Sequence, residues 1–257
     1  MISLAVTSGK GGVGKTTIVA NLAYLLGRMG KRVLVLDADL GLGNLDVLFG
    51  LRPSYTLEHV LLGQKRLKDI VLKGPAQVEL VPAPSGVEEV SHLSRDQRLM
   101  LLEQFEEVLD GVDVLLIDTA PGISSNVVFF NLTASEVLVV VCPEPCSMLD
   151  SYALMKVLAL NHSKRNFRLL VNNAKEALEG MKVFERLDEL ASRFLGASLD
   201  YMGLVPNDPK VLAASKQRRL FVEAYPDSKA TLALEGVARR VLRLPEAKGG
   251  SSGVLFG

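Results

Sequence analysis

The sequence has no tryptophan, only two cysteines and three histidines, and no excess of charge of either sign. The cysteines, Cys142 and Cys146, are too few for a disulfide framework, so a reducing, cytoplasmic compartment is expected. The 29 basic residues balance the 29 acidic ones, which excludes a general electrostatic attraction to nucleic acid or acidic lipid. No apolar run approaches the roughly 18 residues that a membrane span needs, and the first residues do not have the pattern of a signal peptide.

The sequence does contain short, almost continuous apolar runs, which are typical of strands buried on both faces of a parallel sheet. These runs are Ile2–Val6, Val33–Leu36, Val114–Ile117, Val137–Val141 and Leu169–Val171. Helical patterns lie between or after them, beginning at Lys15 and near Arg95–Leu109, Asp150–Leu160, Lys182–Phe194 and Ala230–Leu244. This alternation predicts an α/β fold, a three-layer sandwich with a mostly parallel twisted sheet and helices on both faces.

The length of 257 residues suits one large domain, which we place at residues 1–247. Residues 248–257 have the Gly- and Ser-rich composition of a flexible tail and end in Val254-Leu255-Phe256-Gly257. This tail could be an expression scar, a spacer before a short membrane-touching segment or a truncated end. Residues 234–242 are amphipathic, and we interpret them as the last core-packing helix rather than a membrane helix.

A glycine-rich octet follows the first predicted strand and opens the first predicted helix. It reads Gly9-Lys10-Gly11-Gly12-Val13-Gly14-Lys15-Thr16 and matches the phosphate-loop pattern G-x-x-x-x-G-K-[ST]. The glycines allow a tight turn that aims backbone N–H groups at phosphates, and the helix N-terminus adds partial positive charge. The octet and the adjacent Thr17 are therefore predicted to bind ATP or ADP. Lys15 would reach the β- and γ-phosphates, and the Thr16 hydroxyl would ligate Mg²⁺.

Three carboxylates follow predicted strands. Asp37 and Asp39 end the run from Val33, and Asp118 ends the run from Val114. Ligands of open α/β sheets lie beyond the carboxyl ends of the strands, so these acids should converge on the phosphate loop. Asp118 takes the Walker B position and would hold Mg²⁺ directly or through water, and Asp37 would support the magnesium shell. The alternative for each is an acid that caps a turn or a helix.

The loop also resembles the deviant Walker A motif of the MinD/ParA family, in which a second, signature lysine lies early in the loop. The resemblance implies that Lys10 reaches the phosphates of a nucleotide held by a partner subunit. It also identifies Asp39 with the switch I aspartate that orients the attacking water. Lys10, Lys15 and Asp39 would then be the catalytic residues, and Gly122 would let switch II move. An ATP-dependent homodimer with weak, Mg²⁺-dependent ATPase activity is implied.

Longer stretches resemble the flagellar-number regulators of this family, the FlhG, FleN or YlxH branch. They are Leu40–Pro53, Asp118–Ile123, Phe129–Leu132, Pro143–Pro145, Asp150–Leu154, Ser198–Gly203 and Tyr225–Ser228. The resemblance implies control of the placement or number of flagella. Expected partners are a GTPase of the FlhF kind and flagellar switch or regulator proteins, and peripheral contact with the inner face of the cell membrane is a further expectation.

Three more positions take their roles from the resemblance. Asn172, at a strand end, would read the adenine edge, and Pro206, in Val205-Pro206-Asn207, would belong to a loop that closes over the base. Glu144 would touch the ribose of the partner's nucleotide. The alternatives are a turn residue for Asn172 and a solvated acid for Glu144.

Other interpretations of the chain stay open. A MinD-like ATPase that places the division site is one, and a ParA-like partition or cargo-positioning ATPase is another. A metal-cluster scaffold would need a dimer that brings four cysteines together, because Cys142 and Cys146 supply only two ligands. We interpret the basic cluster Lys216–Arg219 as a solvated helix end, and we do not expect nucleic-acid binding.

Overall fold

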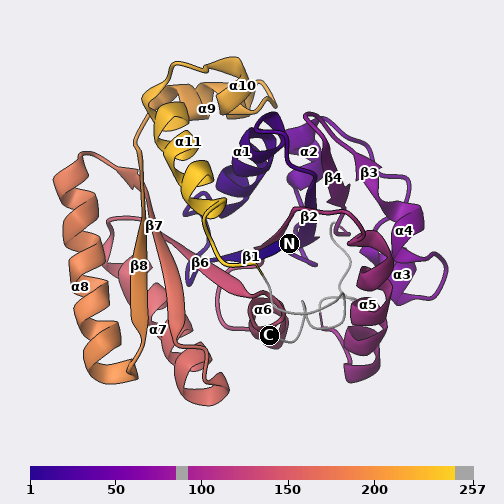
Figure 1. Cartoon of the computed structure of the whole chain (residues 1–257), viewed down its shortest axis with the longest axis horizontal. Helices are drawn as coiled ribbons and strands as arrows, with labels where there is room; N and C mark the ends of the chain where they lie inside the picture. Colours follow the sequence, from indigo (N-terminus) through magenta and orange to yellow (C-terminus); the bar gives the residue numbers. More distant parts are fainter. Residues whose placement is uncertain (85–91, 247–257) are drawn as a thin grey trace.

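The computed structural model describes residues 1–84 and 92–246, which form one eight-stranded sheet with helices on both faces (Figure 1). The strands are β1 (Ile2–Thr7), β2 (Val33–Ala38), β3 (Leu72–Lys73), β4 (Val78–Val81), β5 (Val114–Thr119), β6 (Glu136–Val141), β7 (Asn166–Ala174) and β8 (Ser198–Pro206). Their order in space is β3-β4-β2-β5-β1-β6-β7-β8. All neighbours are parallel except β3, which pairs antiparallel with β4.

The strand order places β1 at the point where the topology changes direction. The chain first builds β2, β4 and β5 on one side of β1 and then adds β6, β7 and β8 on the other. Connections leave such a point in opposite directions, so a crevice forms beyond the carboxyl end of the strand. The glycine-rich loop follows β1 directly and therefore lies in this crevice.

The helices divide between the two faces of the sheet, which alternates its buried side chains between them. One face carries α1, α2, α10 and α11, and the other carries α3 to α8 (Figure 1). Within the described residues the helices are α1 (Lys15–Arg28), α2 (Leu45–Phe49), α3 (Leu57–Leu61), α4 (Leu67–Ile70), α5 (Arg95–Val108), α6 (Ser125–Thr133), α7 (Pro145–His162), α8 (Ala177–Leu195), α9 (Pro209–Lys216), α10 (Phe221–Ala224) and α11 (Lys229–Val241).

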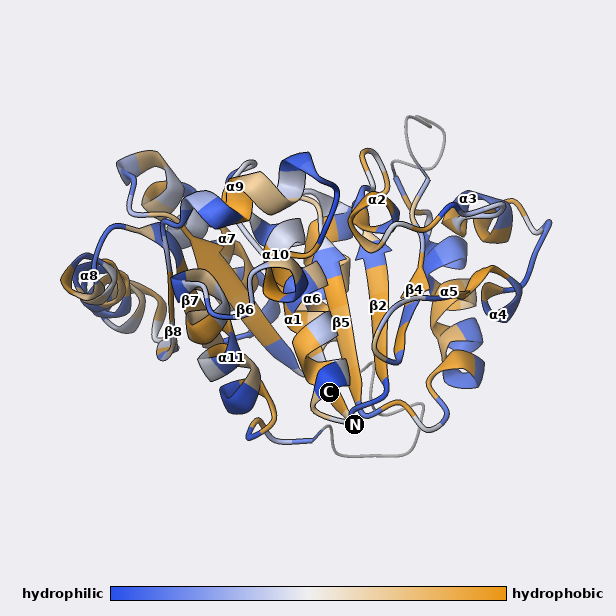
Figure 2. Ribbon diagram, turned by 90° about the horizontal axis from the view of Figure 1, so that it is seen from above, coloured by the Kyte–Doolittle hydropathy of each residue, from blue (hydrophilic) through white to orange (hydrophobic). Residues whose placement is uncertain are grey.

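The central strands are buried along their whole length and end in polar residues. β2 reads VLVLDA and β5 reads VLLIDT, and every residue of both strands is buried. Figure 2 shows them hydrophobic along the ribbon and hydrophilic toward their carboxyl ends. The sheet therefore supplies a rigid apolar base and presents its few polar groups at one edge.

The predicted α/β sandwich is confirmed, although the sequence pattern missed several elements. β8 has buried side chains at Leu199, Met202 and Val205 alone instead of being continuously apolar, and β4 has only four residues, one of them Glu79. α7 begins at Pro145, five residues before the predicted helix, because proline fits the first turn of a helix.

The amphipathic segment 234–242 packs into the core as predicted. In α11, Leu234, Val237, Ala238 and Val241 are buried, and Arg239 and Arg240 are exposed. In the part of the chain that the structure describes, no helix combines the length and apolarity required to cross a bilayer. The predicted tail at 248–257 lies outside the described residues, and the single domain over 1–247 stays a prediction.

Candidate functional site

The glycine-rich loop joins β1 to α1 in a backbone conformation that needs glycine. Gly12 and Gly14 have φ angles of 80° and 88°, in the left-handed region. A Cβ on Gly9 would lie 2.0 Å from the carbonyl carbon of Asp150, so the loop touches the backbone of α7. A Cβ on Gly14 would lie 2.5 Å from Nδ2 of Asn172. The loop is thus held against α7 on one side and the end of β7 on the other.

At the base of the loop, Lys15 and Asp118 form a buried ion pair. Nζ of Lys15 donates to Oδ1 of Asp118 over 3.3 Å, and the two side chains are 7% and 1% exposed. Burial raises the pKa of Asp118, while Lys15 and the hydroxyl of Thr16 act in the opposite direction. Its second oxygen, Oδ2, is buried without a hydrogen-bond partner. A carboxylate oxygen left in this way, next to a threonine hydroxyl, fits a Mg²⁺ ion held directly or through water.

Asp37 lies beside Asp118, because the two residues pair in the register of β2 and β5. Its oxygens accept backbone N–H groups from Asp39 (3.2 Å) and Leu45 (3.3 Å). Burial, together with the charge of Asp118, raises the pKa of Asp37 to about 8. Asp37 therefore ties together the two ends of the segment 39–45, and its predicted place in the magnesium shell stays a prediction.

Asp39 begins that segment and is half-buried at the carboxyl edge of the sheet. Its Oδ1 accepts the N–H of Leu42 over 3.3 Å, which holds the loop in a tight turn. The carboxylate is close to the ion-paired Asp118, whose pKa it helps to raise. The structure thus brings the three predicted carboxylates to one edge.

Lys10 and Glu144, both predicted to reach a partner subunit, pair with each other within this chain. Their Nζ and Oε2 atoms are 3.2 Å apart, and the side chains are 41% and 58% exposed. The hydrogen bond to Glu144 raises the pKa of Lys10. Both residues are accessible, so both are free to change partners when a second charged surface approaches.

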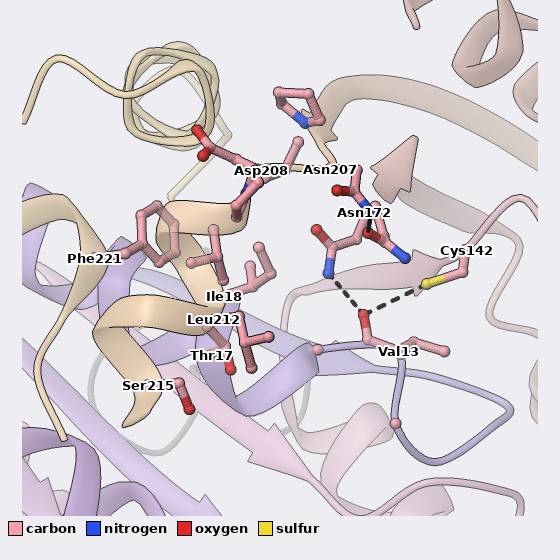
Figure 3. Close-up of a pocket in the computed structure, with 17 residues that line it drawn as sticks. Val13, Thr17, Ile18, Cys142, Asn172, Asn207, Asp208, Leu212, Ser215 and Phe221 are labelled. Atoms are coloured by element: carbon pink, nitrogen blue, oxygen red, sulfur yellow. Dashed lines mark hydrogen bonds between the residues drawn. The ribbon is translucent and has the colours of Figure 1, made fainter. Parts of the chain in front are cut away.

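A cavity of about 540 Å³ lies next to the loop, between α1, the ends of β7 and β8, and α9 (Figure 3). Ile18, Leu212 and Phe221 give it apolar walls. Asn172 lies at its inner end, where Nδ2 donates to the carbonyl of Val13 over 2.7 Å. This size and this mixture of apolar walls with few polar groups are typical of a pocket for a planar ligand such as a nucleobase.

The end of β8 requires one correction. The sequence resemblance predicts a loop at residues 205–207, but Val205 and Pro206 belong to β8 and the loop begins at Asn207. The N–H of Asn207 donates to Ala174 and continues the pairing with β7. Pro206 nevertheless lines the cavity, so a base bound there could contact it as predicted.

Sequence reasoning missed the outer wall of the cavity. Leu212, Ser215 and Phe221 come from α9 and α10, about two hundred residues after the phosphate loop. No local motif marks them, and only the fold brings them to the loop. The nearest sequence signal is Asp208-Pro209, an N-cap followed by a first-turn proline, which marks the start of α9.

The two cysteines do not share an environment. Cys142 is buried and its Sγ lies 3.7 Å from the carbonyl of Val13, whereas Cys146 is exposed in the first turn of α7. Over residues 1–84 and 92–246, no three His, Cys, Asp or Glu side chains are grouped to hold a metal ion. A magnesium ion here would therefore depend on phosphate and water oxygens as well as on protein groups.

A family model described as an AAA domain matches residues 1–171. The chain is 48% identical to the antiactivator FleN of Pseudomonas aeruginosa, over 93% of this chain and 85% of FleN. It is 33% identical to the flagellum site-determining protein YlxH of Helicobacter pylori, over 91% of this chain and 80% of YlxH. The chain belongs to the MinD/ParA family.

The solved structures agree with the MinD/ParA assignment. One of them is the septum site-determining protein MinD complexed with Mg-ADP from Pyrococcus horikoshii. It is 25% identical to this chain, covers 93% of it with 95% of its own length, and has a TM-score of 0.70. Among the relatives of this MinD/ParA chain, FleN and YlxH place it in the flagellar branch that the motifs indicated.

Proposed function

We propose that this protein is a Mg²⁺-dependent ATPase whose ATP-bound form is a homodimer, and that it controls the placement or number of flagella. The observation that carries the enzymatic part is the buried pair of Lys15 and Asp118 beneath the glycine-rich loop. The flagellar part is supported by the similarity to FleN and YlxH.

We expect the site to bind a nucleoside triphosphate. The cavity beside Asn172 and Pro206 would take the adenine, and the N–H groups of the loop and of the first turn of α1 would take the phosphates. Lys15 would turn from Asp118 toward the β- and γ-phosphates, because it already lies at the first position of α1. Mg²⁺, held by Thr16 and by the oxygens of Asp118, would supply charge neutralisation on the phosphates.

Hydrolysis would depend on position and charge rather than on a covalent step. Asp39 would leave the N–H of Leu42 and accept a hydrogen bond from the attacking water. Lys10 would exchange Glu144 for the triphosphate of the partner subunit. Exposed ion pairs are weak, so this exchange has a low cost. ADP lacks the terminal phosphate, so loss of that group would release the dimer.

The dimer is tested by light scattering of Asp39→Ala with ATP, since blocked hydrolysis should trap the associated form. Addition of Lys10→Ala should return the protein to the monomer with near wild-type ATP affinity. Lys68→Ala is the matched control, because Lys68 is also half-exposed and pairs with an acid, Glu107, but lies far from the loop in α4. A double variant that still dimerises would refute the role of Lys10.

The biological role is tested by counting flagella in cells that lack the protein. An altered number or position, restored by the wild-type gene and not by a Lys15→Ala gene, supports the flagellar proposal. Misplaced division septa with normal flagella would favour a MinD-like role instead. Salt-dependent retardation of DNA by the ATP-bound protein would favour a partition role.

A further inference from the structure

Three buried polar side chains meet beneath the site, and none of them has a role in the binding of nucleotide described above. Thr7 is the last residue of β1, Thr119 is the last residue of β5, and Asn131 lies in α6. Each of the three is 0% exposed. Nδ2 of Asn131 lies 3.2 Å from Oγ1 of Thr7, and the two threonine hydroxyl oxygens are 2.9 Å apart.

The hydroxyl of Thr119 has more acceptors than it has protons. Besides Thr7, it lies 3.2 Å from the carbonyl oxygen of Val6 and 3.1 Å from that of Ala120. A hydroxyl carries one proton and can donate it to one of these groups at a time. In one arrangement Thr119 donates its proton to Thr7. If Asn131 donates to Thr7 and Thr7 instead donates to Thr119, the Thr119 proton is left for one of the two carbonyls.

These two carbonyls belong to different parts of the site. Val6 lies in β1, directly before the phosphate loop, whereas Ala120 is the first residue after β5 and leads into Gly122. The N–H of Gly122 donates to the carbonyl of Ser8 over 2.9 Å, so this segment already lies across the start of the loop. The hydroxyl of Thr119 therefore stands between the phosphate loop and the segment after Asp118.

We propose that Thr119 is a positioning residue for ATP hydrolysis, because its hydroxyl holds the Ala120 peptide in one state of the site and the Val6 carbonyl in the other. The inference rests on the proposed ATPase function. The two acceptors lie at almost the same distance, so rotation of the hydroxyl about its C–O bond alone moves the proton from one to the other. Asn131 fixes the start of this chain of hydrogen bonds and links α6, the helix after switch II, to β1.

The carboxylate of Asp118 would be the group that this hydroxyl positions. Asp118 immediately precedes Thr119, and its side chain contacts Lys15. A shift of the Ala120 peptide would move the backbone of β5 at the residue that faces the phosphates. Thr119 would thus affect the rate of the chemical step without touching the nucleotide.

The test compares Thr119→Val, which removes the hydroxyl and keeps the shape, with Thr119→Ser, which keeps the hydroxyl. Thr119→Val should lower kcat about tenfold, which corresponds to the loss of about one hydrogen bond that positions the site, with KM and ATP affinity within about twofold of wild type. Thr119→Ser should restore kcat to within about twofold of wild type.

The matched control is Thr133→Val. Thr133 is a buried threonine of α6 whose hydroxyl donates to the carbonyl of Phe130 in its own helix, with no link to the phosphate loop. It should lower the melting temperature and leave kcat unchanged. If Thr119→Val does not fold, Thr119→Cys, which like serine lacks the methyl group and is a weaker donor, should lower kcat by more than Thr119→Ser does and by less than about tenfold.

Three results would overturn the inference: an unchanged kcat in Thr119→Val or Thr119→Cys, an equal loss in Thr133→Val, or a loss of ATP affinity in parallel with kcat. The last of these would assign Thr119 a structural role only. Wild-type protein without ATPase activity would instead overturn the proposed function itself, so the two failures are distinguishable.

Discussion

The two edges of the sheet differ in how completely their polar residues are paired. At the amino edge, Arg168 of β7 donates to Glu136 of β6 over 2.9 Å and pairs with Asp200 of β8. Lys164, just before β7, donates to two carbonyl oxygens at 2.8 and 2.9 Å. At this edge the charged groups have partners within the chain.

The carboxyl edge is less well satisfied. Asp118 keeps one buried oxygen without a partner, and Asp37 lies beside it with a pKa raised to about 8. Buried polar atoms without a partner and buried carboxyl groups close to one another reduce the stability of the folded chain. The amino edge therefore stabilises the fold, while the carboxyl edge is arranged for a ligand that brings its own charges.

The largest expected effect is on catalysis at the carboxyl edge. Asp39→Ala should lower the rate of ATP hydrolysis about 100-fold or more, because the water loses the group that orients it. The free energy of unfolding should fall by no more than about 1 kcal/mol, because the half-buried Asp39 loses one hydrogen bond, from the N–H of Leu42. Steady-state kinetics measures the rate of hydrolysis, and urea unfolding measures the stability. Lost ATP binding would instead place Asp39 in the magnesium shell and exchange the roles assigned to Asp37 and Asp39.

A substitution at the amino edge should instead lower the stability of the fold and leave ATP binding unchanged. Arg168→Met should lower the free energy of unfolding by about 2 kcal/mol, because it leaves the mostly buried carboxylate of Glu136 unpaired. ATP affinity should not change. Arg66→Met is the control, since its pair with Asp69 is exposed and should contribute little. Urea unfolding measures both variants. An equal loss of unfolding free energy in the two would contradict the distinction between the two edges.

A smaller effect is expected for the binding of nucleotide. Lys15→Ala should weaken ATP binding at least tenfold, or about 1.4 kcal/mol, because a charge-assisted contact in a desolvated site is lost. Calorimetric titration measures this directly. Unchanged affinity would show that the glycine-rich loop does not hold the phosphates through Lys15.

The last prediction concerns the pH dependence of stability. The pKa of Asp37 is higher in the folded chain than in the unfolded chain, so the folded state binds the proton more tightly. This contribution is complete below about pH 4 and is lost as the pH rises through about 8. In nucleotide-free Asp37→Asn protein the unfolding free energy should therefore fall less steeply over this range. Chemical unfolding at several pH values measures how steeply the unfolding free energy changes with pH. Equal slopes for the wild-type and Asp37→Asn proteins would contradict the prediction.

The sequence predicted the parts of the site that are contiguous in the chain. Gly9–Thr16 could be recognised because the glycines, Lys15 and Thr16 have fixed spacing around one turn. The convergence of Asp37 and Asp118 followed from the rule that parallel strands end at one edge, and the register of β2 and β5 confirms it.

Other features depend on contacts that no spacing encodes. The wall formed by Leu212 and Phe221 requires α9 and α10 to fold back over α1. The contact of Asp37 with the N–H of Leu45 depends on the path of a loop, and the pairing of Lys10 with Glu144 joins residues 134 positions apart. Propensity and periodicity describe local structure only, so these features needed the fold.

The register of β1 also affects how the chain folds while it is synthesised on the ribosome. β1 is made first, but its neighbours in the sheet are β5, which begins at Val114, and β6, which ends at Val141. At elongation rates of about 5–20 residues per second, the strand waits on the order of ten seconds for these partners. During that time Ile2–Thr7 is an apolar segment without its strand partners, a condition that favours association with other chains.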